Sequence, residues 1–130
     1  MITLLLVDDQ PTTRLGLRML LGLEPDITVV GEAGDGGAAL DLARTLKPDV
    51  IVMDVAMPGM DGIAATWALR TVAPNSAVVI LSLQDDAATR KRARDAGAFA
   101  FVAKHQQHTA LLGELRQAAA MRHVSQKGGD

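Results

Sequence analysis

Polar side chains follow four apolar runs of this sequence that are typical of buried strands. The side chains at these strand ends are Asp8, Asp9, Asp54, Ser82 and Lys104. In a parallel sheet the carboxyl ends of all strands lie at one edge, where ligands bind. Residues far apart in the sequence therefore converge there. The sequence predicts a site with three carboxylates, one hydroxyl and one ammonium group.

This set of groups suits phosphoryl chemistry. Three neighbouring carboxylates repel one another, and a hard divalent cation such as Mg²⁺ relieves that repulsion through oxygen ligands. An aspartate such as Asp54 can act as a nucleophile and become an aspartyl phosphate. The Ser82 hydroxyl can donate to a phosphoryl oxygen, and the Lys104 ammonium can neutralise its charge.

Each residue alone has a purely structural explanation. Asp8 and Asp9 can cap the helix that follows them, and Asp54 can be an ordinary turn residue. Ser82 can be a loop serine, and Lys104 a solvated lysine. The joint occurrence of all five at one sheet edge favours the functional interpretation.

The elements that must position these residues alternate along the chain. Apolar runs bounded by turn residues predict five strands, at 2–7, 27–33, 50–53, 77–81 and 98–103. Apolar periodicity and end signals predict five helices, at 11–23, 38–46, 63–71, 87–96 and 109–122. Such alternation is typical of an α/β domain, with a parallel sheet covered on both faces. The second strand is less uniformly apolar, so it is expected at a sheet edge.

Size and composition limit the class of protein. The 130 residues suggest one domain, expected over 1–122, with a polar, Gly-rich tail or linker start at 123–130. The chain has no cysteine, which excludes disulfides and thiol chemistry. No run approaches the ~18 apolar residues of a membrane span, and no basic leader opens the chain. A cytoplasmic protein without membrane contact is expected.

Four segments carry a resemblance to a known family. They are the Asp8-Asp9 pair, residues 54–62 (Asp-Val-Ala-Met-Pro-Gly-Met-Asp-Gly), Ser82 and residues 101–104 (Phe-Val-Ala-Lys). Together they resemble the receiver domain of two-component response regulators, over about residues 2–122. The resemblance implies a single flavodoxin-like (βα)5 domain with strand order 2-1-3-4-5.

The resemblance also implies roles for the acidic residues. Asp54 would accept a phosphoryl group from a phosphohistidine on a sensor histidine kinase. Asp9, Asp54 and the backbone carbonyl of Ala56 would bind Mg²⁺ directly, and Asp8 would act through water. The domain would catalyse its own phosphorylation and dephosphorylation and would otherwise be a switch, not a metabolic enzyme.

Three further residues would read the phosphorylated state. By the same resemblance, Ser82 would bond the phosphoryl group and Lys104 would pair with it. Phe101 would be the aromatic side chain that changes rotamer after Ser82 moves. The output would be a population shift on the surface formed by the fourth helix, fifth strand and fifth helix.

Three short segments indicate a subfamily. Residues 9–11 (Asp-Gln-Pro), 31–33 (Gly-Glu-Ala) and 81–86 (Leu-Ser-Leu-Gln-Asp-Asp) are similar to NarL/LuxR-type regulators. Such regulators carry a helix-turn-helix domain after a linker, so DNA would be contacted only through an output domain absent here. The alternative is a stand-alone receiver that relays phosphate or binds a protein directly.

The sequence departs from the family pattern near the site. His105 follows Lys104 where many receivers have Pro, which places the usual cis-peptide bond in question. Leu83 is bulkier than the small residue common there and would narrow access for phosphodonors. Ala56 offers no side chain to hold or block an attacking water. We therefore expect Ala56 and Gln84 to set the lifetime of the phosphoryl group.

Two other classes remain as rivals. A phosphohydrolase of the haloacid-dehalogenase type would also use Asp54 as a nucleophile, but it needs a second Asp at the position of Ala56. A flavodoxin-like FMN binder would need aromatic faces, and aromatic residues make up only 2% of this chain.

The first helix carries two apolar arcs. Thr13, Gly16, Leu17, Leu20 and Leu21 form the arc expected to face the sheet. Leu15, Met19 and Leu23 form a second arc. This second arc is explained either by contact with the fifth helix and scattered surface apolar residues, or by a homodimer surface used on phosphorylation.

Overall fold

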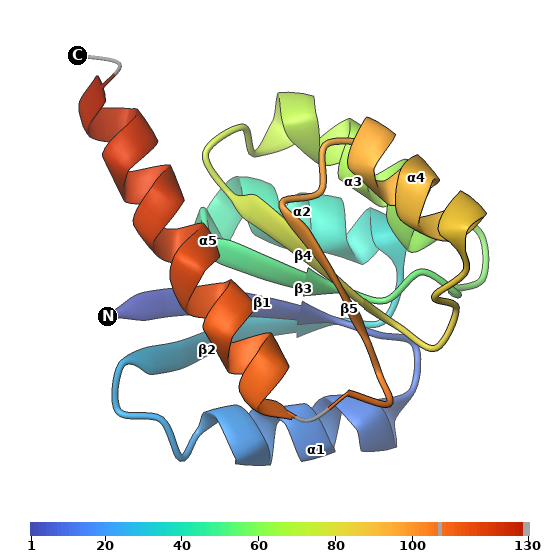
Figure 1. Ribbon diagram of the computed structural model, residues 1–130, viewed down its shortest axis with the longest axis horizontal. Helices are drawn as coiled ribbons and strands as arrows, with labels where there is room; N and C mark the ends of the chain where they lie inside the picture. The colour runs from blue at the N-terminus through green and yellow to red at the C-terminus, as the bar shows by residue number, and fades with distance from the viewer. Residues whose placement is uncertain (107, 129–130) are drawn as a thin grey trace.

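A sheet of five parallel strands forms the centre of the computed structural model, which describes residues 1–106 and 108–128 (Figure 1). The strands are β1 (Ile2–Val7), β2 (Ile27–Ala33), β3 (Val50–Met53), β4 (Ala77–Ser82) and β5 (Ala100–Ala103). Their spatial order is β2-β1-β3-β4-β5, and every neighbouring pair is parallel. The predicted strand order and the edge position of the second strand are confirmed.

Five helices cover the two faces of the sheet. They are α1 (Pro11–Leu21), α2 (Gly36–Leu46), α3 (Gly62–Val72), α4 (Ala87–Asp95) and α5 (His108–Gly128). Helices α1 and α5 lie on one face, and α2, α3 and α4 lie on the other (Figure 1). This arrangement follows from right-handed crossovers between parallel strands, with the direction of winding reversed once.

The alternation of side chains along each strand divides the core into two layers. Leu4 and Leu6 of β1 pack under α1 and α5, whereas Leu5 and Val7 pack under the other three helices. All four side chains are buried. Because both faces of the sheet are covered, β3 is apolar at every position, and β1 and β4 are apolar except at Thr3 and Ser82.

Aspartate side chains cap the N-termini of three of the helices. Asp35, Asp61 and Asp86 accept hydrogen bonds from the backbone N–H groups at the third helical position of α2, α3 and α4, at 2.8, 2.8 and 3.1 Å. Each bond satisfies an N–H group that the helix leaves unpaired. Helix α1 lacks such a side-chain cap and begins with Pro11 instead.

The ends of four elements differ from the predicted ends by two or more residues. Helix α1 ends at Leu21, not at 23, α2 begins at Gly36, not at 38, and β5 begins at Ala100, not at 98. Residues before β5 close α4 instead, because Gly97 has a φ of 101° and the Ala98 N–H donates to the Ala93 carbonyl at 3.0 Å. Helix α5 continues to Gly128, so the tail expected over 123–130 is helical over its first six residues. No proline interrupts this segment, so its backbone bonds continue.

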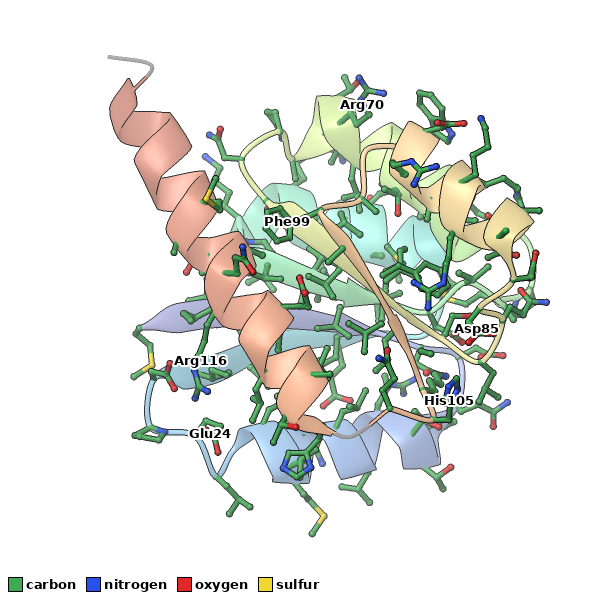
Figure 2. All side chains as sticks on the ribbon, viewed as in Figure 1. Glu24, Arg70, Asp85, Phe99, His105 and Arg116 are labelled. Carbon is green, nitrogen blue, oxygen red and sulfur yellow. The ribbon has the colours of Figure 1, made fainter. Side chains whose placement is uncertain are left out.

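An ion-pair cluster fastens α5 to the loop before β2. The Arg116 guanidinium donates to Glu24 Oε1 at 2.6 Å and to Asp26 Oδ2 at 2.9 Å. The hydrogen bond from Arg116 lowers the pKa of Asp26. Figure 2 shows Arg116 and Glu24 side by side beneath α5. The cluster holds α5 at the end of the sheet opposite to the predicted site.

Within the part of the chain that the structure describes, no helix is both long and apolar enough to span a bilayer.

Candidate functional site

Three carboxylates meet at the carboxyl ends of β1 and β3. Asp8 and Asp9 follow β1, and Asp54 follows β3. One oxygen from each carboxylate lies within 4.8 Å of the other two. Lys104, which follows β5, reaches across β4 to this group. The predicted convergence of distant residues at this sheet edge is what the structure shows.

The backbone N–H and both carboxylate oxygens of Asp8 form hydrogen bonds. Its N–H donates to the Ala33 carbonyl of β2 at 3.1 Å, which continues the strand pairing beyond β1. One carboxylate oxygen accepts from the Gln10 N–H at 2.9 Å, and the other accepts from Lys104 Nζ at 3.0 Å. The residue is only 2% exposed. These bonds give the carboxylate a fixed orientation.

Asp54 is buried beside the same ammonium group. Its Oδ1 lies 3.5 Å from Lys104 Nζ, and the residue is 6% exposed. Burial raises the pKa of Asp54, the nearby Asp8 carboxylate raises it further, and Lys104 opposes both. The ionised form is therefore less favourable here than in water, and added positive charge would stabilise it.

Lys104 carries the compensating charge. Burial by itself lowers the pKa of this ammonium group, but the hydrogen bond to Asp8 and the charges of Asp54 and Asp8 outweigh burial and raise it. The group therefore stays charged at neutral pH. Its backbone N–H donates to the Ser82 carbonyl at 2.8 Å, which fixes the start of the side chain against β4.

The loop after Asp54 folds back tightly onto the strand end. The Gly62 N–H donates to the Val55 carbonyl at 2.9 Å. A Cβ atom at Gly62 would lie 1.8 Å from the Asp54 carbonyl oxygen, so no side chain fits there. The preceding Asp61 caps α3. The Asp-Gly pair is therefore explained by packing against Asp54 together with helix initiation.

Ser82 ends β4 and is 1% exposed. Its Oγ accepts a hydrogen bond from the Gln84 N–H at 3.0 Å, so the hydroxyl proton is still available for a further acceptor. Leu83 is 74% exposed. The bulk of Leu83 therefore lies largely in solvent.

Phe101 and Ala56 flank this site. Phe101 is half-buried in β5, and the Arg90 guanidinium of α4 lies over its ring, 4.6 Å from the centroid. Ala56 is exposed at the start of the loop after β3. The predicted roles of the Ala56 carbonyl in metal binding and of Phe101 in switching stay predictions.

Gln106 closes the loop after Lys104, and His105 stands where many receivers have proline. The peptide bond to His105 is trans. The Gln106 Oε1 accepts from the Ala103 N–H at 2.9 Å, and the Gln106 N–H donates to the Ala103 carbonyl at 3.0 Å. His105 Nε2 lies 3.8 Å from Asp85 Oδ2, and Figure 2 shows these two side chains close together.

Three residues near the site were missed by the sequence analysis. Arg14 contacts the Asp8 backbone, Arg90 covers Phe101, and Gln106 closes the loop after Lys104. No spacing or composition signal distinguishes them, since each acts through a contact that exists only after folding.

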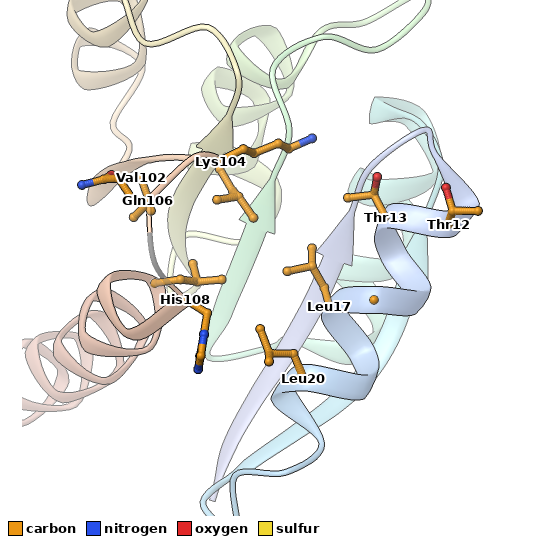
Figure 3. Close-up of a pocket in the computed structure, with 11 residues that line it drawn as sticks. Thr12, Thr13, Leu17, Leu20, Val102, Lys104, Gln106 and His108 are labelled. Carbon is orange, nitrogen blue, oxygen red and sulfur yellow. The ribbon is translucent and has the colours of Figure 1, made fainter.

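An apolar groove of about 300 Å³ separates α1 from β5 and the start of α5 (Figure 3). Leu17 and Leu20 of the inner arc of α1 line it, and Leu21 is buried beside it. The residues of the second arc are exposed by 45% (Leu15), 66% (Met19) and 76% (Leu23). Helix α5 does not cover this second arc.

The donor set fits Mg²⁺. All three clustered side chains offer hard oxygen ligands, which this ion prefers, and none offers nitrogen or sulfur. Burial raises the pKa of Asp54 despite the nearby Lys104, so a cation bound beside it would favour the ionised form. Asp8, Asp9 and Asp54 are therefore the residues that could hold the cation.

Comparison with known proteins gives the same family. The family model for the response regulator receiver domain matches residues 4–116. The nitrate/nitrite response regulator protein NarL of Escherichia coli K12 is 39% identical over 118 residues, covering 91% of this chain and 55% of NarL. A protein-glutamate methylesterase/protein-glutamine glutaminase of Nitrosospira multiformis is 42% identical over 102 residues, covering 77% of this chain and 29% of that protein.

Solved structures agree with the sequence matches. The crystal structure of a LuxR-family two-component response regulator from Aurantimonas superposes with a TM-score of 0.89 at 35% identity, covering 93% of this chain and 86% of that one. The chain spans about half the length of NarL. The chain therefore belongs to the response regulator receiver domain family of two-component systems, and its relatives include regulators of the NarL/LuxR type.

Proposed function

We propose that this domain is a phosphorylation-dependent switch in which Asp54 accepts a phosphoryl group from a phosphohistidine of a sensor histidine kinase. The observation that carries the proposal is the position of Asp54. It is buried at the end of β3, 3.5 Å from Lys104 and clustered with Asp8 and Asp9. A buried carboxylate whose charge is disfavoured by burial is suited to a reaction in which a bound cation neutralises charge.

The proposed transfer forms one bond and breaks one bond. A carboxylate oxygen of Asp54 forms a bond to phosphorus, the P–N bond to the kinase histidine breaks, and the imidazole nitrogen takes up a proton. When bound by Asp9, Asp54 and the Ala56 carbonyl, with Asp8 acting through water, Mg²⁺ would neutralise charge on the transferring group. Lys104, which bonds Asp8 and lies 3.5 Å from Asp54, would contribute a second positive charge.

Ser82 and Phe101 would report the phosphorylated state. In the present arrangement Ser82 Oγ accepts from Gln84 and keeps its proton for a new acceptor. A phosphoryl oxygen on Asp54 would be that acceptor. A shift of Ser82 would then alter the surface formed by α4, β5 and α5, where Phe101 lies under Arg90.

The output is proposed to be control of transcription. NarL, which this chain matches over about half its length, is a response regulator, and the LuxR family supplies a structural relative. DNA would be contacted only through an output domain absent from this chain. The methylesterase match supports an alternative, since it joins a similar receiver to a different activity. A stand-alone receiver in a phosphorelay is the other alternative.

A homodimer is proposed for the phosphorylated state. Leu15 and Met19 lie on one arc of α1, Leu23 follows two residues after the end of the helix, and all three are exposed. Burial of this arc against a second copy would remove these apolar side chains from water.

The phosphorylation proposal is tested by intact mass. The protein is incubated with acetyl phosphate in the presence and absence of Mg²⁺. We expect the mass of one phosphoryl group to be added with Mg²⁺ and to be absent with EDTA and in Asp54→Asn. Asp41→Asn, which alters an exposed aspartate of α2, is the matched control and should be modified like the parent. Equal modification of Asp54→Asn would overturn the proposal.

A further inference from the structure

Arg14, in the first turn of α1, joins the carboxyl ends of two strands at the acidic site. Its Nη1 donates to the Asp8 carbonyl oxygen at 2.5 Å, and its Nε donates to Glu32 Oε1 at 3.2 Å. Gly34 packs beside the guanidinium, since a Cβ atom there would be in ordinary van der Waals contact with Arg14 Nη1, at 3.5 Å. One planar group therefore ties the carboxyl end of β1 to the carboxyl end of β2.

A second arginine shares the same carboxylate. Arg18 Nη1 donates to Glu32 Oε2, so Glu32 lies between two guanidinium groups. The Arg14 side chain is 20% exposed and that of Arg18 is 51% exposed. Among the contacts of the described residues, Arg18 reaches Glu32 but not Asp8. Arg18 therefore provides a matched control one helical turn away from Arg14.

The Asp8 carbonyl belongs to the peptide group that links Asp8 to Asp9. The Asp8 carboxylate has its own partners in Gln10 and Lys104. Within residues 1–106 and 108–128, no hydrogen bond or ion pair holds the Asp9 carboxylate. The direction of the Asp9 side chain therefore depends on the orientation of this peptide group, which Arg14 fixes.

We propose that Arg14 is a positioning residue for the metal site. Its bonds to Asp8 and Glu32 hold the Asp8–Asp9 peptide group in the orientation that brings three carboxylates within 4.8 Å of one another. The inference rests on the proposed function, in which a divalent cation binds these carboxylates. Partners that orient metal ligands typically contribute 10–100-fold in metal affinity.

Charge alone would have the opposite effect. A guanidinium near the site repels a divalent cation, so its removal would tighten cation binding if Arg14 acted only through its charge. If Arg14 positions the peptide group, its removal weakens binding. Arg14→Lys separates the two effects, because an ammonium group keeps the charge but lacks the rigid fork that reaches both acceptors.

The experiment measures Mg²⁺ binding by NMR titration of backbone amides in the parent, Arg14→Gln, Arg14→Lys and Arg18→Gln. We expect dissociation constants about tenfold higher in both Arg14 variants and within about twofold of the parent in Arg18→Gln. Urea unfolding of each variant without metal establishes that the fold is kept. If Arg14→Gln does not fold, the Mg²⁺ dissociation constants of Arg14→Lys and Glu32→Gln are compared with that of the parent instead.

Two results would overturn the inference while leaving the proposed function intact. One is parent-like Mg²⁺ affinity in Arg14→Lys, and the other is tighter binding in Arg14→Gln. Failure of the parent itself to bind Mg²⁺ would instead overturn the metal part of the proposed function, and this inference with it.

Discussion

At the scale of single residues, the site stores unfavourable electrostatic energy. Asp8 and Asp54 are almost fully buried and share one ammonium group, Lys104, at 3.0 and 3.5 Å. Burial and the Asp8 charge raise the pKa of Asp54 despite that ammonium. The buried carboxylate therefore lowers the free energy of unfolding of the metal-free protein, in a site that we propose binds a cation and a phosphoryl group.

This cost predicts that Asp54→Asn stabilises the metal-free protein. A carboxyl group whose pKa is raised on folding above its ordinary value near 3.8 lowers stability once the pH exceeds that value. The penalty grows until the pH passes the raised pKa. In EDTA at pH 7, urea unfolding of Asp54→Asn should show about 1 kcal/mol more stability than the parent. The difference should vanish below about pH 4.

The control for this measurement is Asp41→Asn, an exposed site on α2 that should change stability little. A stability difference between the parent and Asp54→Asn that stays constant from pH 4 to pH 8 would refute the electrostatic explanation.

The exposed position of Ala56 predicts an effect on phosphoryl lifetime. A long side chain there would cover the approach of water to Asp54, so Ala56→Arg should slow dephosphorylation about tenfold, a barrier change of ~1.4 kcal/mol. Gln84→Ala should also change the rate, because the bond from the Gln84 N–H to Ser82 holds residue 84, and hence its side chain, next to the site. Loss of label from the phosphorylated protein measures both. Rates equal to that of the parent in both variants would end this idea.

The sequence predicted the acidic and basic site residues because each follows a buried strand. It did not predict Arg14, Arg90 or Gln106. These three act through a carbonyl, a ring and an edge N–H group that belong to other elements. Such contacts depend on the packing distance between elements, which a single sequence does not encode in any local pattern.

At the scale of elements, the turn from β3 to α3 is the most constrained part of the site. Gly62 lies against the Asp54 carbonyl, and its N–H group donates to Val55. Any displacement of this turn would move Asp54 with it. The Asp61 cap starts α3 at Gly62, which keeps this glycine at the contact with Asp54.

Gly62→Ala should therefore destabilise the protein by more than about 3 kcal/mol, since the added Cβ would lie 1.8 Å from backbone oxygen. Gly113→Ala in α5 has no atom within 4 Å of the new Cβ and should stabilise by about 0.5–1 kcal/mol. Thermal and urea unfolding measure both. Equal effects at the two glycines would contradict the close packing of this turn.

The order and type of the elements were predicted from apolar runs in the strands, the second of which is less uniform, and from apolar periodicity in the helices. Their ends were less predictable. The start of β5 depends on how residues 97–98 close α4, and that choice involves a bond back to Ala93. The end of α5 was placed too early because polar and Gly-rich composition favours a tail, whereas the helix continues into Gly128.

At the scale of the whole molecule, the two faces of the domain have different exposed chemistry. The second arc of α1 exposes Leu15 and Met19, and Leu23 is exposed just after the helix. Helix α4, on the opposite face, presents charged residues, and its Lys91 and Arg92 pair with Asp95 and Asp61. An apolar arc next to an open groove is the better candidate for self-association.

The dimer proposal predicts that Leu15→Glu abolishes association of the phosphorylated protein. The glutamate would place a charge on the apolar arc, and this charge would have to be buried without a partner in the dimer. Sedimentation should show a dimer for the phosphorylated parent and a monomer for this variant. Trp67→Gln, which changes an exposed apolar residue of α3 on the other face, should leave the dimer intact. Unchanged sedimentation of Leu15→Glu would exclude this surface.

The central claim is that the phosphoryl group is carried by Asp54. Reduction with borohydride after incubation with acetyl phosphate and Mg²⁺ converts an acyl phosphate to an alcohol and releases phosphate, so the modified aspartate becomes homoserine. Peptide mass spectrometry then identifies its position. The account predicts homoserine at residue 54 and unchanged aspartate at residues 8 and 9. Homoserine at residue 8 or 9, or none after a verified gain of one phosphoryl mass, would contradict it.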